Sequence, residues 1–305
     1  MTATPVSSST AWASAAARPA FRAADFLVLA KPRLNLLVIV TTLAGLYLAS
    51  PEGVALPILI HTLLGTALVA SGAAALNQAW ERDTDALMAR TRMRPVPSGR
   101  LRATDALWFA VVLSMAGLVD LAAGVNLLSA SVAALTLVTY VFVYTPLKRR
   151  TSLATLVGAV PGALPPVIGW TAAGGGVTVP ALVLFGIVFL WQMPHFLAIA
   201  WLYRHEYAAA GIPLLPVVEP DGRRTGRQAL FYAAALWPVS LMPSLVGLAG
   251  GFYITVATLL GCALVALSAG FARERSTPAA RRLFVFSIIY LPLLWGALVA
   301  DRLWI

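Results

Sequence analysis

The sequence predicts an all-α, polytopic membrane protein with about nine transmembrane helices. Its 305 residues are 60% hydrophobic and only 11% charged, and its mean hydropathy is +0.83. This composition excludes an ordinary soluble domain. Apolar runs long enough to cross a bilayer recur along the chain, and basic residues gather in every second gap between them. We expect a disordered Ala- and Ser-rich tail over residues 1–24 and one integral-membrane domain over residues 25–305.

Nine apolar segments are the candidates for membrane-spanning helices, since about 20 helical residues cross the hydrocarbon core. In order they are Leu34–Ala49, Val54–Leu76, Ala106–Ala122, Leu127–Thr145, Leu153–Ala172, Val179–Leu202, Ala229–Ala249, Phe252–Phe271 and Leu283–Ala300. The single cysteine, Cys262, lies inside the eighth segment, so an intramolecular disulfide is excluded. Asp301 and Arg302 follow the last segment, and we expect a local ion pair between them.

The basic residues predict the orientation in the membrane. Of the 22 lysines and arginines, all except Arg302 lie before the first segment or in the gaps after the second, fourth, sixth and eighth segments. By the positive-inside rule these parts face the cytoplasm. We therefore expect a bacterial inner-membrane protein with a cytoplasmic N-terminus and a periplasmic C-terminus. The net charge of +10 is then a topology signal, and we expect no nucleic-acid partner.

A polar motif follows the second segment and contains Asn77, Glu81 and Asp85. On a helix that continues out of the membrane, each step of four residues turns about 400° and rises about 6 Å, so these side chains share one face. An amide and two carboxylates form an oxygen-rich surface that suits Mg²⁺. The alternative is that the charges merely mark the end of a transmembrane helix. We favour the metal site because the amide lies within the apolar end and a block of arginines follows.

Basic residues near the same membrane face are candidates for binding a phosphate group, most simply a diphosphate. They are Lys31, Arg33, Arg90, Arg94, Lys148, Arg149 and Arg204. A second interpretation stays open for Lys31 and Arg33: their long side chains could snorkel to the membrane–water interface and anchor the first helix there. A second interpretation also stays open for Lys148 and Arg149, because basic residues in this gap could serve only to set the orientation of the protein in the membrane.

The fifth and sixth segments contain features that a plain transmembrane helix lacks. Pro161, Pro165 and Pro166 in the fifth predict a kinked, cavity-lining span. The sixth segment carries Gln192 and His195, three residues apart. Polar groups at this depth are costly and usually face the bundle interior. A lone histidine there is more often a hydrogen-bonded interior group than a metal ligand.

Tyr203 and Tyr207 follow the sixth segment four residues apart, so on a helix they face the same way. They could cap a site at the cytoplasmic face. Tyrosine is also common at membrane interfaces for its amphipathic ring alone, so that alternative stays open.

These motifs resemble the UbiA superfamily of intramembrane prenyltransferases. Asn77, Glu81 and Asp85, followed by Arg94-Pro95, are similar to the first acidic motif of that superfamily. Further matches resemble its haem-farnesylating branch, the haem O synthases, over essentially residues 25–302. They are Lys31-Pro32-Arg33, Asn77 through Thr91, Tyr144 through Arg149, Trp191 through Phe196, Ala210 through Val218 and Ser287 through Leu291.

The resemblance implies a helical bundle around a central cavity, with Mg²⁺ and a diphosphate held at Asn77, Glu81 and Asp85. It implies transfer of the farnesyl group from farnesyl diphosphate to a vinyl group of haem B, which gives haem O for terminal oxidases. Haem B is then a substrate rather than a permanent cofactor. The resemblance places Gln192, His195, Tyr203 and Tyr207 on the acceptor side. A haem A synthase is the partner that such a product implies.

One departure from the wider superfamily concerns the stretch after the sixth segment. Many members carry a second aspartate-rich motif there, whereas this sequence has Tyr203 and Tyr207 at the matching positions. The haem branch is similar in this respect, which favours haem as the acceptor. The departure leaves the ligands of a second metal open, with Glu206 as the candidate.

Two alternatives stand beside the haem acceptor. A UbiA-type prenyltransferase with an aromatic quinone precursor as acceptor is the nearer one, although the tyrosines and the Gln192–His195 pair disfavour it. The more distant one is a transporter, whose polar groups would lie near the bilayer midplane in repeated halves of the chain. Here the polar groups gather at one membrane face and no repeat is evident.

Overall fold

The computed structural model describes residues 23–303, and every regular element in that part of the chain is helical. The predicted tail over residues 1–24 lies outside the described residues, except that Ala23 and Ala24 begin the first helix. The predicted all-α fold class is confirmed.

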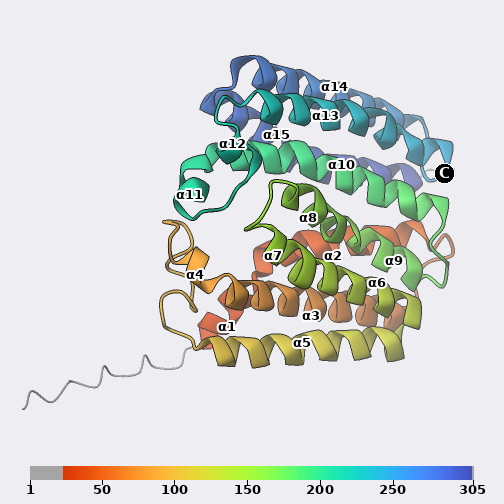
Figure 1. The fold of residues 1–305 in the computed structure, drawn as a ribbon. Helices are drawn as coiled ribbons and strands as arrows, with labels where there is room; N and C mark the ends of the chain where they lie inside the picture. The colour runs from red at the N-terminus through yellow and green to blue at the C-terminus, as the bar shows by residue number, and fades with distance from the viewer. Residues whose placement is uncertain (1–22, 304–305) are drawn as a thin grey trace, which may run out of the picture.

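Long helices lie side by side along one common direction (Figure 1). The elements are α1 (Ala23–Ala30), α2 (Pro32–Leu48), α3 (Leu56–Trp80), α4 (Arg82–Asp85), α5 (Ala103–Gly124), α6 (Leu127–Val138), the π-helix η1 (Thr139–Tyr144), α7 (Thr145–Leu147), α8 (Ala154–Ala163), α9 (Pro165–Ala172), α10 (Val179–Leu202), α11 (Arg204–Ala209), α12 (Leu215–Val218), α13 (Arg223–Leu245), α14 (Gly251–Glu274) and α15 (Thr277–Arg302). The short helices α4, α11 and α12 lie at one end of the bundle, called here the α4 end, and α15 ends at the opposite end (Figure 1).

Each predicted apolar segment falls on a long helix or on consecutive helices of the structure. Within residues 23–303, seven helical stretches are long and apolar enough to cross a membrane. An eighth span results if α1 and α2, bent by 46°, are counted together. The remaining long helix, α13, contains Arg223, Arg224 and Arg227 in its first turns and two prolines further on. The protein is therefore a multi-pass membrane protein, while the count of nine stays a prediction.

The fifth apolar segment, for which the prolines predict a kink, is interrupted at Leu164 and is called here the broken span. α8 ends at Ala163 and α9 begins at Pro165. A proline has no N–H, so carbonyls near the break need other donors. Gln192 on α10 contacts this region, since its Nε2 donates to the carbonyl of Ala159 at 3.1 Å. The broken span is also the most deeply buried of the candidate spans among the described residues.

Two glycines let α2 and α9 pack backbone to backbone. A Cβ on Gly169 would overlap the carbonyl oxygen of Thr42, and one on Gly45 would overlap that of Pro166. Backbone atoms cannot swing away as a flexible side chain can, so neither position accommodates a larger residue. Such close contacts between small residues are a common way to hold membrane helices together. The contact fixes α2, which begins next to Lys31, against the broken span.

Asp301 is buried near the opposite end of the bundle. Its Oδ2 accepts hydrogen bonds from the backbone N–H groups of Gly250 and of Tyr253, the latter at 3.3 Å. These groups lie at the start of α14, where N–H groups have no partner within the helix. The carboxylate therefore caps α14 and joins it to α15, in place of the local ion pair with Arg302 that the sequence suggested.

Candidate functional site

The three oxygen-bearing residues of the polar motif share one buried face, as the sequence predicts. α3 ends at Trp80 and α4 begins at Arg82, yet the helical hydrogen bonds run through the junction. Glu81 N donates to Asn77 O at 2.9 Å, and Asp85 N donates to Glu81 O at 2.8 Å. The side chains of Asn77, Glu81 and Asp85 are all buried. The repeat of four residues therefore produces a row of an amide and two carboxylates at the α4 end.

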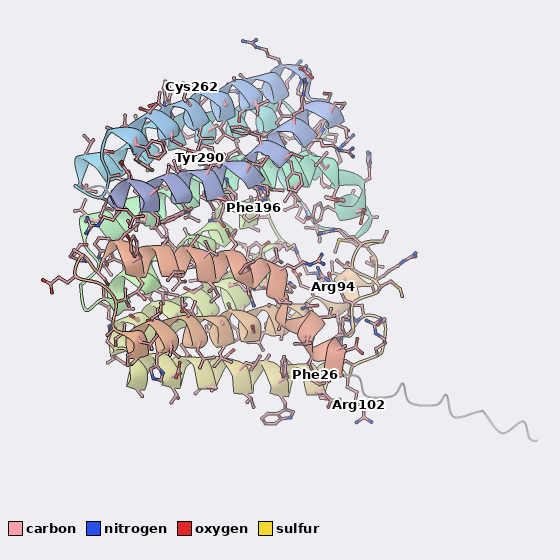
Figure 2. All side chains as sticks on the ribbon, turned by 180° about the vertical axis from the view of Figure 1, so that it is seen from behind. Phe26, Arg94, Arg102, Phe196, Cys262 and Tyr290 are labelled. Atoms are coloured by element: carbon pink, nitrogen blue, oxygen red, sulfur yellow. The ribbon has the colours of Figure 1, made fainter. Side chains whose placement is uncertain are left out.

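Each carboxylate of this row lies next to a cation. Lys148 Nζ is 3.1 Å from Glu81 Oε1 and 3.3 Å from Oε2. Arg94 Nη1 donates to Asp85 Oδ2 at 2.6 Å, and Figure 2 shows Arg94 at this end of the bundle. The two pairs neutralise two carboxylates that would otherwise repel one another in a partly dry environment.

A third cation comes from the turn between α1 and α2. Lys31 Nζ donates to Asn77 Oδ1 at 3.5 Å, and Lys31 interacts electrostatically with the charges of Glu81, Asp85, Arg94 and Lys148. Its backbone has φ of +48°, a left-handed conformation that a side chain other than glycine seldom adopts. Such strain tends to persist at functional sites, where the surrounding structure holds it in place.

The electrostatics keep Lys148 charged. Burial by itself lowers the pKa of this ammonium, but Tyr144 and Glu81, followed by Tyr207 and the hydrogen bond to Glu81, outweigh it. The net effect is a pKa above the ordinary value of 10.5. At neutral pH the site therefore presents a fixed positive charge next to Glu81.

The donor set fits a hard divalent cation that is shared with a phosphate ligand. Two carboxylates and one amide oxygen are the protein ligands that Mg²⁺ typically keeps when phosphate oxygens and water complete its shell. No group of three His, Cys, Asp or Glu residues suited to a metal occurs in residues 23–303. The row at Asn77, Glu81 and Asp85 offers two carboxylates and one amide oxygen, which suits a metal that arrives with its substrate.

Thr145 contacts the row of Asn77, Glu81 and Asp85, although its sequence context does not predict this contact. Its Oγ1 accepts from Asn77 Nδ2 at 3.2 Å and donates to the carbonyl of Tyr140 at 2.9 Å. The carbonyl of Tyr140 lies within η1, where a π-helical turn interrupts the α-helical pattern. Such turns often occur at functional sites. The signal in the sequence was the motif from Tyr144 to Arg149, but nothing in its composition predicts the π-helix.

Arg90 lies between the two tyrosines that follow α10. Its Nη2 donates to the hydroxyl of Tyr207 at 2.8 Å, and its guanidinium lies 5.4 Å and 5.1 Å from the ring centroids of Tyr203 and Tyr207. Met88 helps to bring the two segments together, because it packs with Tyr207 in a small buried cluster. Arg90, which we expect to bind the diphosphate, is therefore in cation–π contact with Tyr203 and Tyr207, which we expect on the acceptor side.

The other candidate residues lie outside this cluster of contacts. Arg33 and Arg149 are exposed. Arg204 donates to the carbonyl of Trp201 at 2.8 Å and lies over the ring of that tryptophan. Glu206 has one buried oxygen, Oε2, without a hydrogen-bond partner. This oxygen is an unused acceptor, and within residues 23–303 Glu206 forms no hydrogen bond or ion pair with Asn77, Glu81 or Asp85.

Gln192 and His195 have different partners on α10. Gln192 supports the broken span, as described above. His195 Nδ1 lies 2.8 Å from Ser287 Oγ on α15, and Ser287 Oγ donates to the carbonyl of Phe284 at 2.7 Å. Because a serine has one hydroxyl proton, His195 Nδ1 must be the donor, and in the neutral ring Nε2 then carries the lone pair.

Comparison with known proteins gives matches of two kinds. The model of the UbiA prenyltransferase family matches residues 38–295. A protoheme IX farnesyltransferase of Solibacter usitatus (strain Ellin6076) is 50% identical over 287 residues, which cover 91% of this chain and 98% of that protein. A protoheme IX farnesyltransferase of Myxococcus xanthus (strain DK1622) is 47% identical over 281 residues, which cover 92% of this chain and 95% of that protein.

Two solved structures share the fold. One, from work on digeranylgeranylglyceryl phosphate synthase in membranes, has a TM-score of 0.79 and 16% sequence identity, with 92% of this chain and 99% of that chain covered. The other, a UbiA homologue from Archaeoglobus fulgidus bound to GPP and Mg²⁺, has a TM-score of 0.64 and 16% identity, with 90% and 99% covered. At this level of identity the likeness shows a common helical architecture.

Proposed function

The chain belongs to the UbiA prenyltransferase family, and from this membership we propose that it is a protohaem IX farnesyltransferase. The reaction moves the farnesyl group of farnesyl diphosphate onto a vinyl group of haem B and gives haem O. The name of the relatives that are 50% and 47% identical over nearly their whole length supports this acceptor. The observation that carries the proposal for the site is the buried row of Asn77, Glu81 and Asp85 with cations placed against it.

The site residues suit the departure of a diphosphate. During transfer, the bond between C1 of the farnesyl chain and a diphosphate oxygen breaks, and negative charge develops on that oxygen. Lys148, Arg94 and Lys31 provide positive charge that is in position before the reaction, which is the arrangement that stabilises developing charge best. In the free protein Glu81 and Asp85 hold two of these cations, so the cationic side chains are kept at the site until a diphosphate is present.

Mg²⁺ is the cofactor of this proposal, and Asn77, Glu81 and Asp85 are the residues that would hold it. When bound, it supplies Lewis-acid neutralisation of the diphosphate oxygens. Arg90 is the further cation on the diphosphate side, kept in place by Tyr203 and Tyr207.

The acceptor side of the proposal includes Gln192, His195, Tyr203 and Tyr207. A bond forms between farnesyl C1 and the terminal vinyl carbon of haem B, a water molecule adds to the other vinyl carbon, and one proton is released. The allylic cation must meet the vinyl group before it meets other water, and helices packed within a membrane exclude water. The free lone pair on His195 Nε2 can ligate iron or accept a proton on this side.

The cellular setting follows from the same proposal. A bacterial inner membrane would supply both amphiphilic substrates. The distribution of basic residues supports an orientation with the α4 end and the N-terminus in the cytoplasm and the C-terminus in the periplasm. A haem A synthase is the partner that would use the product.

Haem extraction is the experiment that tests this function. Membranes of a host that lacks haem O, with and without this protein, are extracted and their haems separated by chromatography and mass spectrometry. We expect a more hydrophobic haem whose mass has increased by one farnesyl group and one hydroxyl group. The purified protein should make the same product from haem B, farnesyl diphosphate and Mg²⁺. A folded protein that prenylates a hydroxybenzoate and leaves haem unchanged would instead support the quinone-precursor alternative, and one that releases no diphosphate would contradict both.

A further inference from the structure

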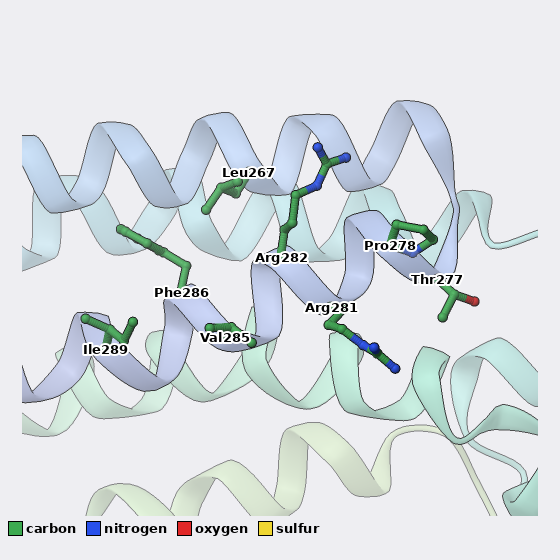
Figure 3. Close-up of a pocket in the computed structure, with 8 residues that line it drawn as sticks. All are labelled: Leu267, Thr277, Pro278, Arg281, Arg282, Val285, Phe286 and Ile289. Carbon is green, nitrogen blue, oxygen red and sulfur yellow. The ribbon is translucent and has the colours of Figure 1, made fainter.

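A groove of about 770 Å³ runs along α15 beside α14 (Figure 3). Its lining residues come from α15, its first turn included, and from Leu267 on α14. None of them belongs to the row at Asn77, Glu81 and Asp85 or to the acceptor side. The groove is therefore a separate feature of the surface that the proposed reaction does not use.

The groove has a cationic end and an apolar end. Arg281 and Arg282 line it in the second turn of α15, and Val285, Phe286 and Ile289 line it further along the helix. Val285 and Ile289 are 49% and 48% exposed, so they face whatever surrounds the bundle. The lining residues form two adjacent rows along α15, with Arg282 and Phe286 on the side toward Leu267 and Arg281, Val285 and Ile289 in the neighbouring row (Figure 3). The part lined by α15 extends over about 18 Å from Thr277 to Ile289, at about 1.5 Å per residue.

The charge at the cationic end is largely uncompensated. Arg281 has no hydrogen-bond or ion-pair partner within residues 23–303. Arg282 Nη2 lies 2.9 Å from Glu274 Oε2, and Glu274 is the single acid between Arg273 and Arg282. The first turn of α15 adds the partial positive charge of a helix N-terminus. This end of the groove therefore attracts an anion.

The position of the cationic end fits the level of lipid headgroups. α15 begins at the α4 end of the bundle (Figure 1), and the whole helix is a candidate membrane span. Arg281 and Arg282 then lie near the membrane surface, while Val285 and Ile289 lie one and two turns deeper, within the acyl chains. Basic pockets between membrane helices on the cytoplasmic side typically bind anionic lipid headgroups.

We propose that this groove is a binding site for an anionic phospholipid. Its phosphate is held by Arg281 and Arg282, and one acyl chain lies along Val285, Phe286 and Ile289. The charge selects an anionic headgroup over a zwitterionic one, and the apolar length selects a lipid over a free phosphate. The site would hold α14 and α15 together at the membrane surface.

Native mass spectrometry of the full-length protein is the test. The protein is reconstituted in nanodiscs of phosphatidylcholine with a minority of phosphatidylglycerol, released in mild detergent, and examined for retained lipid. We expect the wild-type protein to retain phosphatidylglycerol in preference to phosphatidylcholine. In the double variant Arg281→Gln/Arg282→Gln, the ratio of retained phosphatidylglycerol to phosphatidylcholine should fall roughly ten- to thirtyfold. Each arginine near an anionic surface contributes about a factor of five to lipid binding. Val285→Trp, which fills the apolar part without changing the charge, should also reduce retention.

Arg223→Gln/Arg224→Gln is the matched control. These arginines are also consecutive and also lie at the start of a long helix, α13, and their side chains are 74% and 70% exposed. This variant changes the net charge equally and should retain phosphatidylglycerol like the wild type. Equal losses in both double variants would show general surface attraction and overturn the proposal. Unchanged retention of phosphatidylglycerol by Arg281→Gln/Arg282→Gln would also overturn it. The same holds if the wild-type protein retains phosphatidylcholine as well as it retains phosphatidylglycerol.

Discussion

Lys148 and Glu81 lie 67 residues apart in the sequence, yet Lys148 Nζ is within 3.3 Å of both carboxylate oxygens of Glu81. The pair joins the segment after α7 to the junction of α3 and α4. Glu81 is 6% exposed as a side chain and Lys148 14%, so each charge depends on the other for compensation. The same contact therefore serves the stability of the bundle and, in our proposal, the handling of a diphosphate.

Glu81→Gln should lower the turnover number for haem O formation at least about a hundredfold, because in our proposal it replaces a charged metal ligand by a neutral side chain of nearly the same shape. Asp85→Asn should do the same. Chelation of divalent cations should stop the wild-type reaction, and added Mg²⁺ should restore it. Haem O is measured by chromatography, with the melting temperature in detergent as a control for folding. Wild-type turnover in either variant would remove that residue from the site.

Lys148→Met should destabilise the protein by about 3 kcal/mol, because a buried carboxylate is left without its cation. The double variant Glu81→Gln/Lys148→Met should recover part of this loss. The pKa of Lys148 is raised on folding, so its stabilising contribution is present below pH 10.5 and is lost as the pH rises through the folded value. An alkaline decrease in melting temperature should therefore be smaller in Lys148→Met than in the wild type. An equal decrease in both would contradict this assignment.

Tyr207→Phe should raise the KM for farnesyl diphosphate about five- to tenfold, since the hydroxyl that holds Arg90 is lost while the ring remains. Arg90→Lys keeps the charge but loses the planar group that stacks on both rings, so it should raise KM by at least as much. Tyr203→Phe keeps its ring under Arg90 and should have the smallest effect. Steady-state kinetics with saturating haem B would measure all three, and an unchanged KM in Arg90→Lys would exclude Arg90 from diphosphate binding.

His195→Ala should impair the use of haem more than the use of farnesyl diphosphate. The measurement is the KM for haem B compared with the rate at which diphosphate is released in its absence. Ser287→Ala removes the acceptor for His195 Nδ1 and leaves the ring, so it should give a weaker change in the same direction. A parallel loss of both activities in His195→Ala would assign the residue to packing with Trp191 and Phe284, whose rings lie 5.0 Å and 5.2 Å away.

Asp301→Ala should lower stability by about 1–2 kcal/mol without changing KM for either substrate, because it removes the cap of α14 far from the α4 end. Thermal unfolding in detergent and steady-state kinetics measure the two effects. Arg302→Ala is the control, and it should be close to the wild type. A larger loss of stability in Arg302→Ala than in Asp301→Ala would instead support the local ion pair between Asp301 and Arg302 that the sequence predicts.

The sequence was most informative where a periodic pattern determines geometry. The spacing of Asn77, Glu81 and Asp85 predicted a shared face, and the prolines of the fifth segment predicted that its helix would be disturbed, which the interruption at Leu164 shows. Both features depend on the local chain, so the sequence contains the necessary information. The pairing of Lys148 with Glu81 and of Arg94 with Asp85 depends on how separate helices pack, which no spacing reveals.

Other features of the site could not be predicted for a related reason. Arg90 was expected on the diphosphate side and Tyr207 on the acceptor side, whereas the structure places them in contact. The role of Thr145 is not predictable from the sequence, because a threonine beside a proline has no distinctive chemistry until the fold brings the amide of Asn77 to 3.2 Å from its hydroxyl. Arg33 and Arg149 matched the pattern as well as Lys31 and Lys148 did, but they are exposed.

The π-helix η1 has a consequence for insertions and deletions in the chain. A π-turn contains one residue more than the α-helical turn it replaces, so deleting one residue between Thr139 and Tyr144 could restore a regular helix of nearly the same length. The chain beyond that point would keep nearly the same direction, because the wide turn holds its extra residue within about one turn, and Lys148 would still face Glu81. A deletion in a regular part of the same helix would instead rotate everything beyond it by about 100°, so relatives that shorten this helix by one residue keep the pair most easily when the residue is lost from η1.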